Sequence, residues 1–323
     1  MQDTSIINST KKIEENLKEI NEQSRNYIKD VLVLINKEIG INKILSILLF
    51  GSQRAQSEAT AVSDCDLLII FKDRVSNHHI KEMEKYFIAL EIKHKFRDFN
   101  KKLPKKVLGV IQQTTGIFVS HFLTKRKYWE ERHFHKIFRV NKVFSAAFAP
   151  RNIVLGNVIC NSTNLYGKDL RNRLKSKIRI SFIEILKSTI MNLMISFFSI
   201  IISLFRKLEP TKYQLEAVKW ALKAANFYCY RDAEDLNIII NRFIAFEKPR
   251  SQIRAKKFFA RFMNYRKAPI GDMNFMLRCP MRIIKIHLQA ITYQKFVNRK
   301  FPTQIPSIPL ETIIPDRTFP LRI

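Results

Sequence analysis

Cysteine is scarce in this chain, and the four that it has lie far apart, at positions 65, 160, 229 and 279. No Cys-x-x-Cys pair occurs, and no cysteine has a histidine at zinc-ligand spacing, which excludes the usual structural zinc sites and a disulfide scaffold. We expect reduced, mostly buried thiols. The first 30 residues are polar and charged, so no secretory signal is indicated. The expected location is cytoplasmic.

Acidic residues are also scarce relative to basic ones. The 323 residues include 28 Asp and Glu against 57 Lys and Arg, a formal net charge of +29. This excess attracts polyanions, of which nucleic acid is the first candidate and an anionic membrane surface the second. A cell whose proteins are broadly rich in lysine is the alternative explanation, and charge alone does not separate the two.

One stretch of the chain carries a pattern that indicates chemistry. The apolar run that ends at Phe50 is followed by Gly51-Ser52, and a second apolar run opens with Asp64-Cys65-Asp66. Side chains alternate along a strand, so both carboxylates point to one side, where they repel each other unless a cation lies between them. Hard divalent ions such as Mg²⁺ bind oxygen ligands of this kind. A Gly-Ser turn offers exposed N–H groups and a hydroxyl to a phosphate.

This pattern resembles that of the DNA polymerase β-like nucleotidyltransferase superfamily. Eleven residues separate Ser52 from Asp64, and the loop contains Glu58-Ala59-Thr60, as the minimal members of that family have. Their preceding Arg-Gly is replaced here by Gln56-Ser57. The resemblance covers roughly residues 41–169, about a third of the chain.

The resemblance implies an α+β fold, with a small mixed β-sheet and flanking helices followed by an α-helical domain. We therefore predict four parts. Residues 1–40 form an N-terminal helix packed on the catalytic domain, 41–168 the nucleotidyltransferase domain, 169–300 the helical domain and 301–323 a Pro-rich tail. Periodicity predicts helices over 9–38 and 76–93 and strands over 43–50, 116–124 and 152–160.

The resemblance also implies roles for individual residues. Gly51, Ser52 and Ser63 would bind the phosphates of a nucleoside triphosphate, and Asp64 and Asp66 would bind Mg²⁺ or Mn²⁺. The expected activity is transfer of a nucleoside monophosphate to an acceptor. Because such catalysis depends on positioning and electrostatics, loss of either carboxylate should be severe.

The family's third carboxylate, on the next central strand, has no counterpart in the predicted strand 116–124. His121 lies at mid-strand and could replace it as base or metal ligand. A structural histidine is the commoner role for a lone His, and Asp98 is another candidate for the missing group. A protein that binds nucleotide without transferring it is a further interpretation of this absence.

The apolar run at 188–205 raises the question of a membrane helix, because it contains no charge. Ser188, Asn192, Ser196, Ser199 and Ser203 form one stripe at helical spacing. Such a stripe suits close packing of a helix inside a bundle, although small residues also line membrane helix interfaces. We favour a core helix over a membrane span, which the run does not exclude.

The acceptor is the part that the sequence specifies least. In the helical region 250–267, the cations recur at helical spacing, and so do three aromatic rings: Arg254, Lys257 and Arg261, with Phe258, Phe262 and Tyr265. A basic ridge beside aromatic rings fits single-stranded RNA or DNA, in which cations contact phosphates and rings can stack on bases. In an ordinary amphipathic helix the rings would instead face the core and the cations water. RNA is the first predicted acceptor, and a toxin–antitoxin-type enzyme that nucleotidylates another protein is the alternative.

Overall fold

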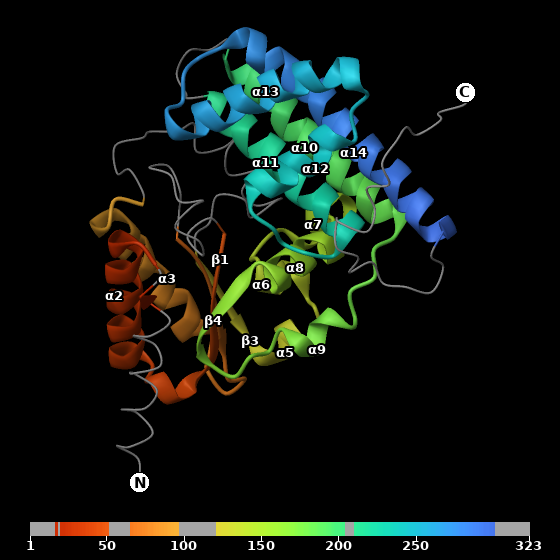
Figure 1. Cartoon of the computed structure of the whole chain (residues 1–323). Coiled ribbons are helices and arrows are strands. Elements are labelled where there is room, and N and C mark those ends of the chain that lie inside the picture. The colour runs from red at the N-terminus through yellow and green to blue at the C-terminus, as the bar shows by residue number, and fades with distance from the viewer. Residues whose placement is uncertain (1–16, 19, 52–64, 97–120, 204–209, 301–323) are drawn as a thin grey trace.

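A four-stranded mixed sheet lies at the centre of the N-terminal half. The computed structural model describes residues 17–18, 20–51, 65–96, 121–203 and 210–300 (Figure 1). The strands lie in the order β3-β2-β1-β4, with β1 antiparallel to both neighbours and β2 parallel to β3. The strand bounds are Ile44–Phe50 (β1), Asp66–Phe71 (β2), His121–Lys125 (β3) and Ser162–Gly167 (β4).

Both faces of this sheet are covered by helices, which is why its central strands are continuous apolar runs. Leu67 and Ile69 of β2 pack in a core under α2 and α3. Leu68 and Ile70 pack in a second core on the other face of the sheet, together with residues of α5 (Arg126–Glu130), α6 (Phe134–Ile137), α8 (Arg151–Cys160) and α9 (Asn172–Lys175). Figure 1 shows the two helical layers on opposite sides of the sheet. The helices of the first layer are α2 (Glu22–Glu38) and α3 (Asn77–Lys93), and a short 3₁₀ turn, η1 (Ile41–Lys43), precedes β1.

The helix predicted over 9–38 is interrupted within the described residues. Asn21 accepts a hydrogen bond from the Ser24 backbone N–H at 2.8 Å and caps α2, which therefore begins at Glu22. Ser76 caps α3 in the same way, at the boundary that the sequence predicts.

The second layer corrects one prediction. Residues 152–160, predicted as a strand, form most of helix α8. The β-branched residues that suggested a strand are buried on a helix that packs between the sheet and α11, so tertiary packing overrides their propensity. The helices of this layer are α5 (Arg126–Glu130), α6 (Phe134–Ile137), α7 (Lys142–Phe148), α8 (Arg151–Cys160) and α9 (Asn172–Lys175).

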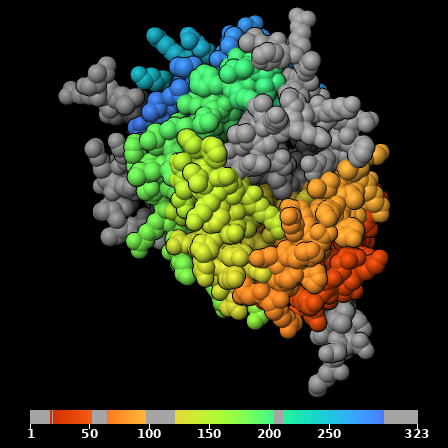
Figure 2. All heavy atoms as spheres, turned by 180° about the vertical axis from the view of Figure 1, so that it is seen from behind, coloured from red at the N-terminus to blue at the C-terminus, as the bar shows by residue number. Residues whose placement is uncertain are grey.

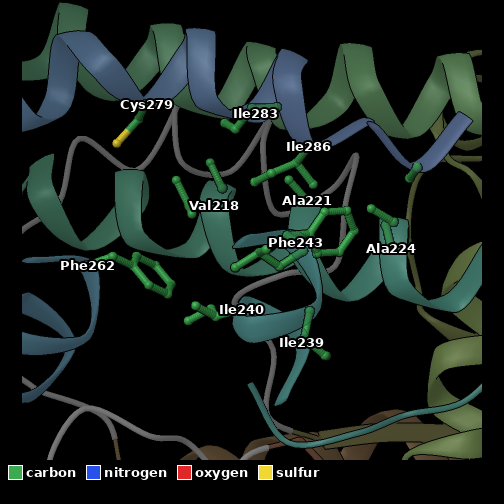
Figure 3. Packing of buried hydrophobic residues seen from close by; sticks show 14 of the residues in the cluster. Val218, Ala221, Ala224, Ile239, Ile240, Phe243, Phe262, Cys279, Ile283 and Ile286 are labelled. Carbon is green, nitrogen blue, oxygen red and sulfur yellow. The ribbon is translucent and has the colours of Figure 1, made fainter. Parts of the chain in front are cut away.

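The rest of the described chain is helical, with α11 at the centre of its core. Figure 3 shows Val218 and Ala221 of α11 packed against Ile283 of α14 and Phe243 of α12. The mixed α+β architecture thus agrees with the predicted fold class. The helices are α10 (Phe182–Ser203), α11 (Pro210–Tyr230), α12 (Leu236–Ala245), α13 (Pro249–Lys267) and α14 (Met273–Lys300).

The helix α10 has the polar stripe that its spacing predicts. Ser188, Asn192, Ser196 and Ser199 are all at most 1% exposed, and the stripe faces neighbouring helices. The opposite face is open to solvent, so α10 is not a fully buried core helix. By length and composition alone, α10 is the one unbroken helix in the described part of the chain that could cross a membrane. The bent pair α7 and α8 passes the same test only if it is counted as a single span.

Candidate functional site

The backbone at Gly51 lies directly against the side chain of Asp66. Gly51 follows the last residue of β1 and has φ of +81°, a conformation that glycine adopts easily. A Cβ atom at this position would lie 2.2 Å from Asp66 Oδ2. Register explains the contact, because Phe50 at the end of β1 pairs with Asp66 at the start of β2. The structure therefore brings together one predicted phosphate-binding residue and one predicted metal ligand.

Strand alternation determines the face on which Asp66 lies. Cys65 is fully buried in the core under α2 and α3. Asp66, the next residue, belongs to the face of Leu68 and Ile70, and its side chain is half-buried. Among the described residues no group of three or more His, Cys, Asp and Glu has the geometry of a metal site. Ser52, Ser63 and Asp64 lie outside the described residues.

His121 lies on the opposite face of the sheet from Asp66. It opens β3 in register with Leu67, and its Nδ1 is 2.6 Å from Glu91 Oε1 of α3. The ring is 3% exposed and packs 5.0 Å from the ring of Phe87. Within the described structure its Nε2 makes no hydrogen bond. The structure thus does not bring His121 to Asp66, and the contacts are those of a structural histidine. Asp98 lies outside the described residues.

A cationic side chain that sequence reasoning missed reaches the neighbourhood of Gly51. Arg171 donates a hydrogen bond to the backbone carbonyl of Ser162, and Ser162 pairs with Phe50 across the sheet. Two further hydrogen bonds, at 2.8 and 2.7 Å, join Arg171 to both oxygens of Asp169. The hydrogen bond from Arg171 holds the pKa of Asp169 below its ordinary value. The signal that could have found this arginine is the Leu-Tyr-Gly-Lys-Asp turn directly before it, at the predicted domain boundary.

A second cation, Arg231, lies just beyond α11 and close to Cys160 at the end of α8. The Cys160 thiol donates a hydrogen bond of 3.7 Å to the Arg231 carbonyl. The guanidinium lies 5.6 Å over the ring of Phe227, and burial lowers the pKa of Arg231. Burial raises the pKa of Cys160, whereas Lys175, Arg231 and Arg171 act to lower it. Positive charge from Arg171, Lys175 and Arg231 therefore gathers beside the end of the sheet that carries Gly51.

On α13 the structure has the exposed cations of the predicted RNA-binding ridge but buries its two phenylalanine rings. Arg254, Lys257 and Arg261 are exposed, as predicted. Phe258 and Phe262 are 8% and 0% exposed, however, because they belong to the core around α11. Two of the three rings predicted to stack bases therefore face the core, as in an ordinary amphipathic helix. The third, Tyr265, is half-buried, and its hydroxyl donates a hydrogen bond of 2.7 Å to Asp272.

Comparison with known proteins adds a distant structural likeness. No protein-family model matches the sequence, and a search of curated proteins gives no match. Among solved structures, the spectinomycin adenyltransferase AAD(9) from Enterococcus faecialis, determined with ATP and spectinomycin, aligns with a TM-score of 0.47 and 8% sequence identity. The alignment covers 82% of this chain and 98% of that one.

Proposed function

We propose that this protein is a metal-dependent nucleotidyltransferase, which transfers a nucleoside monophosphate from a nucleoside triphosphate to an acceptor. The observation that carries the proposal is the contact between Gly51 and the Asp66 carboxylate at adjacent strand ends. A turn with positive φ exposes main-chain N–H groups to a phosphate, and a carboxylate beside it suits a divalent ion. The Gly-Ser and Asp-x-Asp pattern of the sequence supports the same assignment.

The metal would be held by Asp64 and Asp66, whose oxygen atoms are the donor type that Mg²⁺ and Mn²⁺ prefer. When bound, the ion supplies positive charge where negative charge develops on the phosphates. The chain supplies the rest of the positioning. Gly51, Ser52 and Ser63 would bind the triphosphate, and the cations near Cys160 would raise its local concentration.

The bonds change at the α-phosphate. A hydroxyl oxygen of the acceptor attacks the α-phosphorus, and a new phosphoester bond forms there. The bond breaks between the α-phosphorus and the oxygen that bridges it to the β-phosphorus. Pyrophosphate leaves with the electron pair of that bond. The proton of the hydroxyl passes to water.

Nucleotide binding without transfer is the second candidate. The described strand β3 reads His-Phe-Leu-Thr-Lys and has no carboxylate, whereas the resembled family has one on the corresponding strand. This candidate predicts that the protein retains a nucleoside triphosphate but releases no pyrophosphate.

Labelling with nucleoside triphosphates tests both candidates. The protein is incubated with each α-labelled triphosphate and Mg²⁺ or Mn²⁺, with and without total RNA, and the RNA, protein and small-molecule fractions are separated. We expect label in one fraction, and which fraction gains it identifies the acceptor class. Asp66→Ala should lower transfer by roughly 10²- to 10³-fold or more, because the variant loses the metal ligand.

The control variant is Glu82→Gln, which removes a carboxylate charge from an exposed position on α3. It should transfer label as the wild type does. Wild-type-like transfer by a folded Asp66→Ala variant would contradict the proposed mechanism. Triphosphate retention with no pyrophosphate release by the wild type would favour the second candidate instead.

RNA is the proposed acceptor, because α13 presents exposed cations and the chain has a large positive net charge. Because Phe258 and Phe262 of α13 are buried, binding there would depend mainly on phosphate contacts and would show little preference for base sequence. Label found in a polypeptide would instead identify the protein-modifying alternative.

A further inference from the structure

The helix α10 is built with its polar side inward. Its inner stripe of Ser and Asn packs against α11 and α14 and is buried. Its outer side is made of large apolar side chains without a charged one from Ser188 to Ser203. Exposure of Met194, Phe197 and Ile201 is 52%, 52% and 54%. A core helix would have the opposite arrangement, with its largest apolar side chains inside.

A second apolar ridge, on α14, lies beside the first. The two helices are antiparallel neighbours, since Ser203 Oγ lies 3.8 Å from Met273 Sδ and Asn192 Nδ2 lies 3.3 Å from His287 Nε2. We define the outer apolar face by eight side chains of these helices, each 40% to 68% exposed: Leu186, Ile190, Met194, Phe197, Ile201, Leu277, Met281 and Leu288. Figure 2, which views the molecule from behind, shows α10 in green on the surface.

An apolar face of this extent marks a contact with another molecule. Soluble monomers rarely expose contiguous apolar patches larger than a few hundred Å². Eight large side chains on two adjacent helices exceed the scattered apolar residues of an ordinary surface.

The charge of the surrounding elements indicates the chemistry of the partner. Residues 249–300, which form α13 and α14, contain 13 Lys and Arg and a single acidic residue, Asp272. Arg278 is exposed next to Leu277 on α14, and all the cations of the neighbouring helix α13 except the buried Arg266 are exposed. Arg282 connects the two helices but is not a free cation, because its guanidinium lies 5.2 Å over the ring of Phe258 and 2.7 Å from the buried carboxylate of Glu247. Exposed cations thus lie beside the α14 part of the outer apolar face.

We propose that the outer apolar face binds the surface of an anionic lipid bilayer. Interfacial helices of this kind insert apolar side chains at the boundary between head groups and acyl chains while nearby cations bind anionic head groups. A second copy of the chain is a poorer occupant, because it would bring the same excess of positive charge to the contact. The helix α10 would lie along the membrane surface rather than cross it, since its inner side is packed on α11 and α14.

Vesicle co-sedimentation of the full-length protein tests the proposal. Vesicles of pure phosphatidylcholine are compared with vesicles of equal parts phosphatidylcholine and phosphatidylglycerol. We expect the protein to sediment with the anionic vesicles and to stay in solution with the neutral ones. The variant Phe197→Gln/Ile201→Gln leaves the net charge unchanged and should lower binding about tenfold, because binding scales with buried apolar area.

The matched control is Val33→Gln, which changes an apolar side chain that is 67% exposed on α2, on the other side of the molecule. It should bind as the wild type does, and circular dichroism should show both variants folded. Equal binding by the double variant and the wild type would overturn the proposal. Equal binding of the wild type to neutral and anionic vesicles, or no binding to either, would also overturn it. So would a wild-type protein that is a dimer without lipid and becomes a monomer in the double variant.

Discussion

Two residues, Gly51 and Asp66, determine the geometry of the candidate site. Glycine is required there for two independent reasons, its φ of +81° and the 2.2 Å approach that a Cβ would make to Oδ2. Left-handed backbone costs other residues about 1–2 kcal/mol. The collision of a Cβ at position 51 with Asp66 affects the candidate site directly, because the Asp66 carboxylate would have to move.

Gly51→Ala should therefore lower activity more than stability. We expect nucleotidyl transfer to fall about tenfold or more, because the Asp66 carboxylate must move, and the free energy of unfolding to fall by about 1–2 kcal/mol. Transfer rates and urea unfolding of both proteins measure this. Gly271→Ala is the control, since a Cβ there meets nothing within 4 Å. If Gly51→Ala left nucleotidyl transfer unchanged, the Asp66 carboxylate would have no role in that reaction.

At the residue scale, the sequence predicts contacts between residues that lie close together in the chain. The contact between Gly51 and Asp66 follows from two strands that flank a loop, and alternation along β2 separates Asp66 from Cys65. The face of His121 does not follow, because it depends on the register between β3 and β2, which are far apart in the chain.

Among the helices, a buried histidine connects three elements. His287 of α14 lies 3.3 Å from Asn192 of α10 and 2.9 Å from the hydroxyl of Tyr228 on α11. A neutral imidazole has one donor and one acceptor nitrogen and can satisfy both contacts. Full burial lowers the pKa of His287 to about 3, because a charged ring would lose its hydration.

This histidine should make the protein less stable in mild acid. Below the unfolded pKa, about 6.5, the unfolded chain binds a proton that the folded chain cannot, so the free energy of unfolding falls as pH falls. Between pH 7 and pH 5 we expect a loss of about 2 kcal/mol. Urea unfolding at pH 7 and pH 5 measures it. His287→Gln should remove most of this dependence, whereas His78→Gln, at an exposed position, should retain it. An unchanged pH dependence in His287→Gln would assign the effect to other groups.

The sequence predicts the pattern of polar and apolar residues along a helix better than it predicts which side of that helix is buried. The polar stripe of α10 is visible in its spacing, but the exposure of its other side depends on the placement of α11 and α14. The burial of Phe258 on α13 depends likewise on its stacking with Phe275 of α14, 5.1 Å away. In α8, local β-propensity predicted the wrong element, because it does not report the packing of this segment between the sheet and α11.

At the scale of the whole molecule, charge should dominate any binding to RNA. We expect affinity to fall steeply with salt concentration, with a log–log slope that reports the number of neutralised phosphates. Filter binding across a salt series measures it. Changing Arg254, Lys257 and Arg261 to Gln should weaken binding and reduce the slope by about two to three, because each phosphate that is no longer neutralised accounts for roughly 0.7–0.9.

The control changes three exposed lysines on α2 and α3, Lys29, Lys37 and Lys81, to Gln. It removes the same charge from another region and should leave most of the binding intact. Equal weakening in both triple variants would mean that net charge alone attracts RNA, and no retention by the wild type would remove RNA as acceptor.

The junction of sheet and helices contains one close approach with a wider consequence. A Cβ at Gly156 of α8 would lie 2.0 Å from the ring of Phe227 on α11. The close packing of α8 against α11 therefore depends on the absence of a single methyl group at position 156. An alanine at this position would force the Phe227 ring or one of the two helices to move, so Gly156 sets how closely α8 and α11 approach each other.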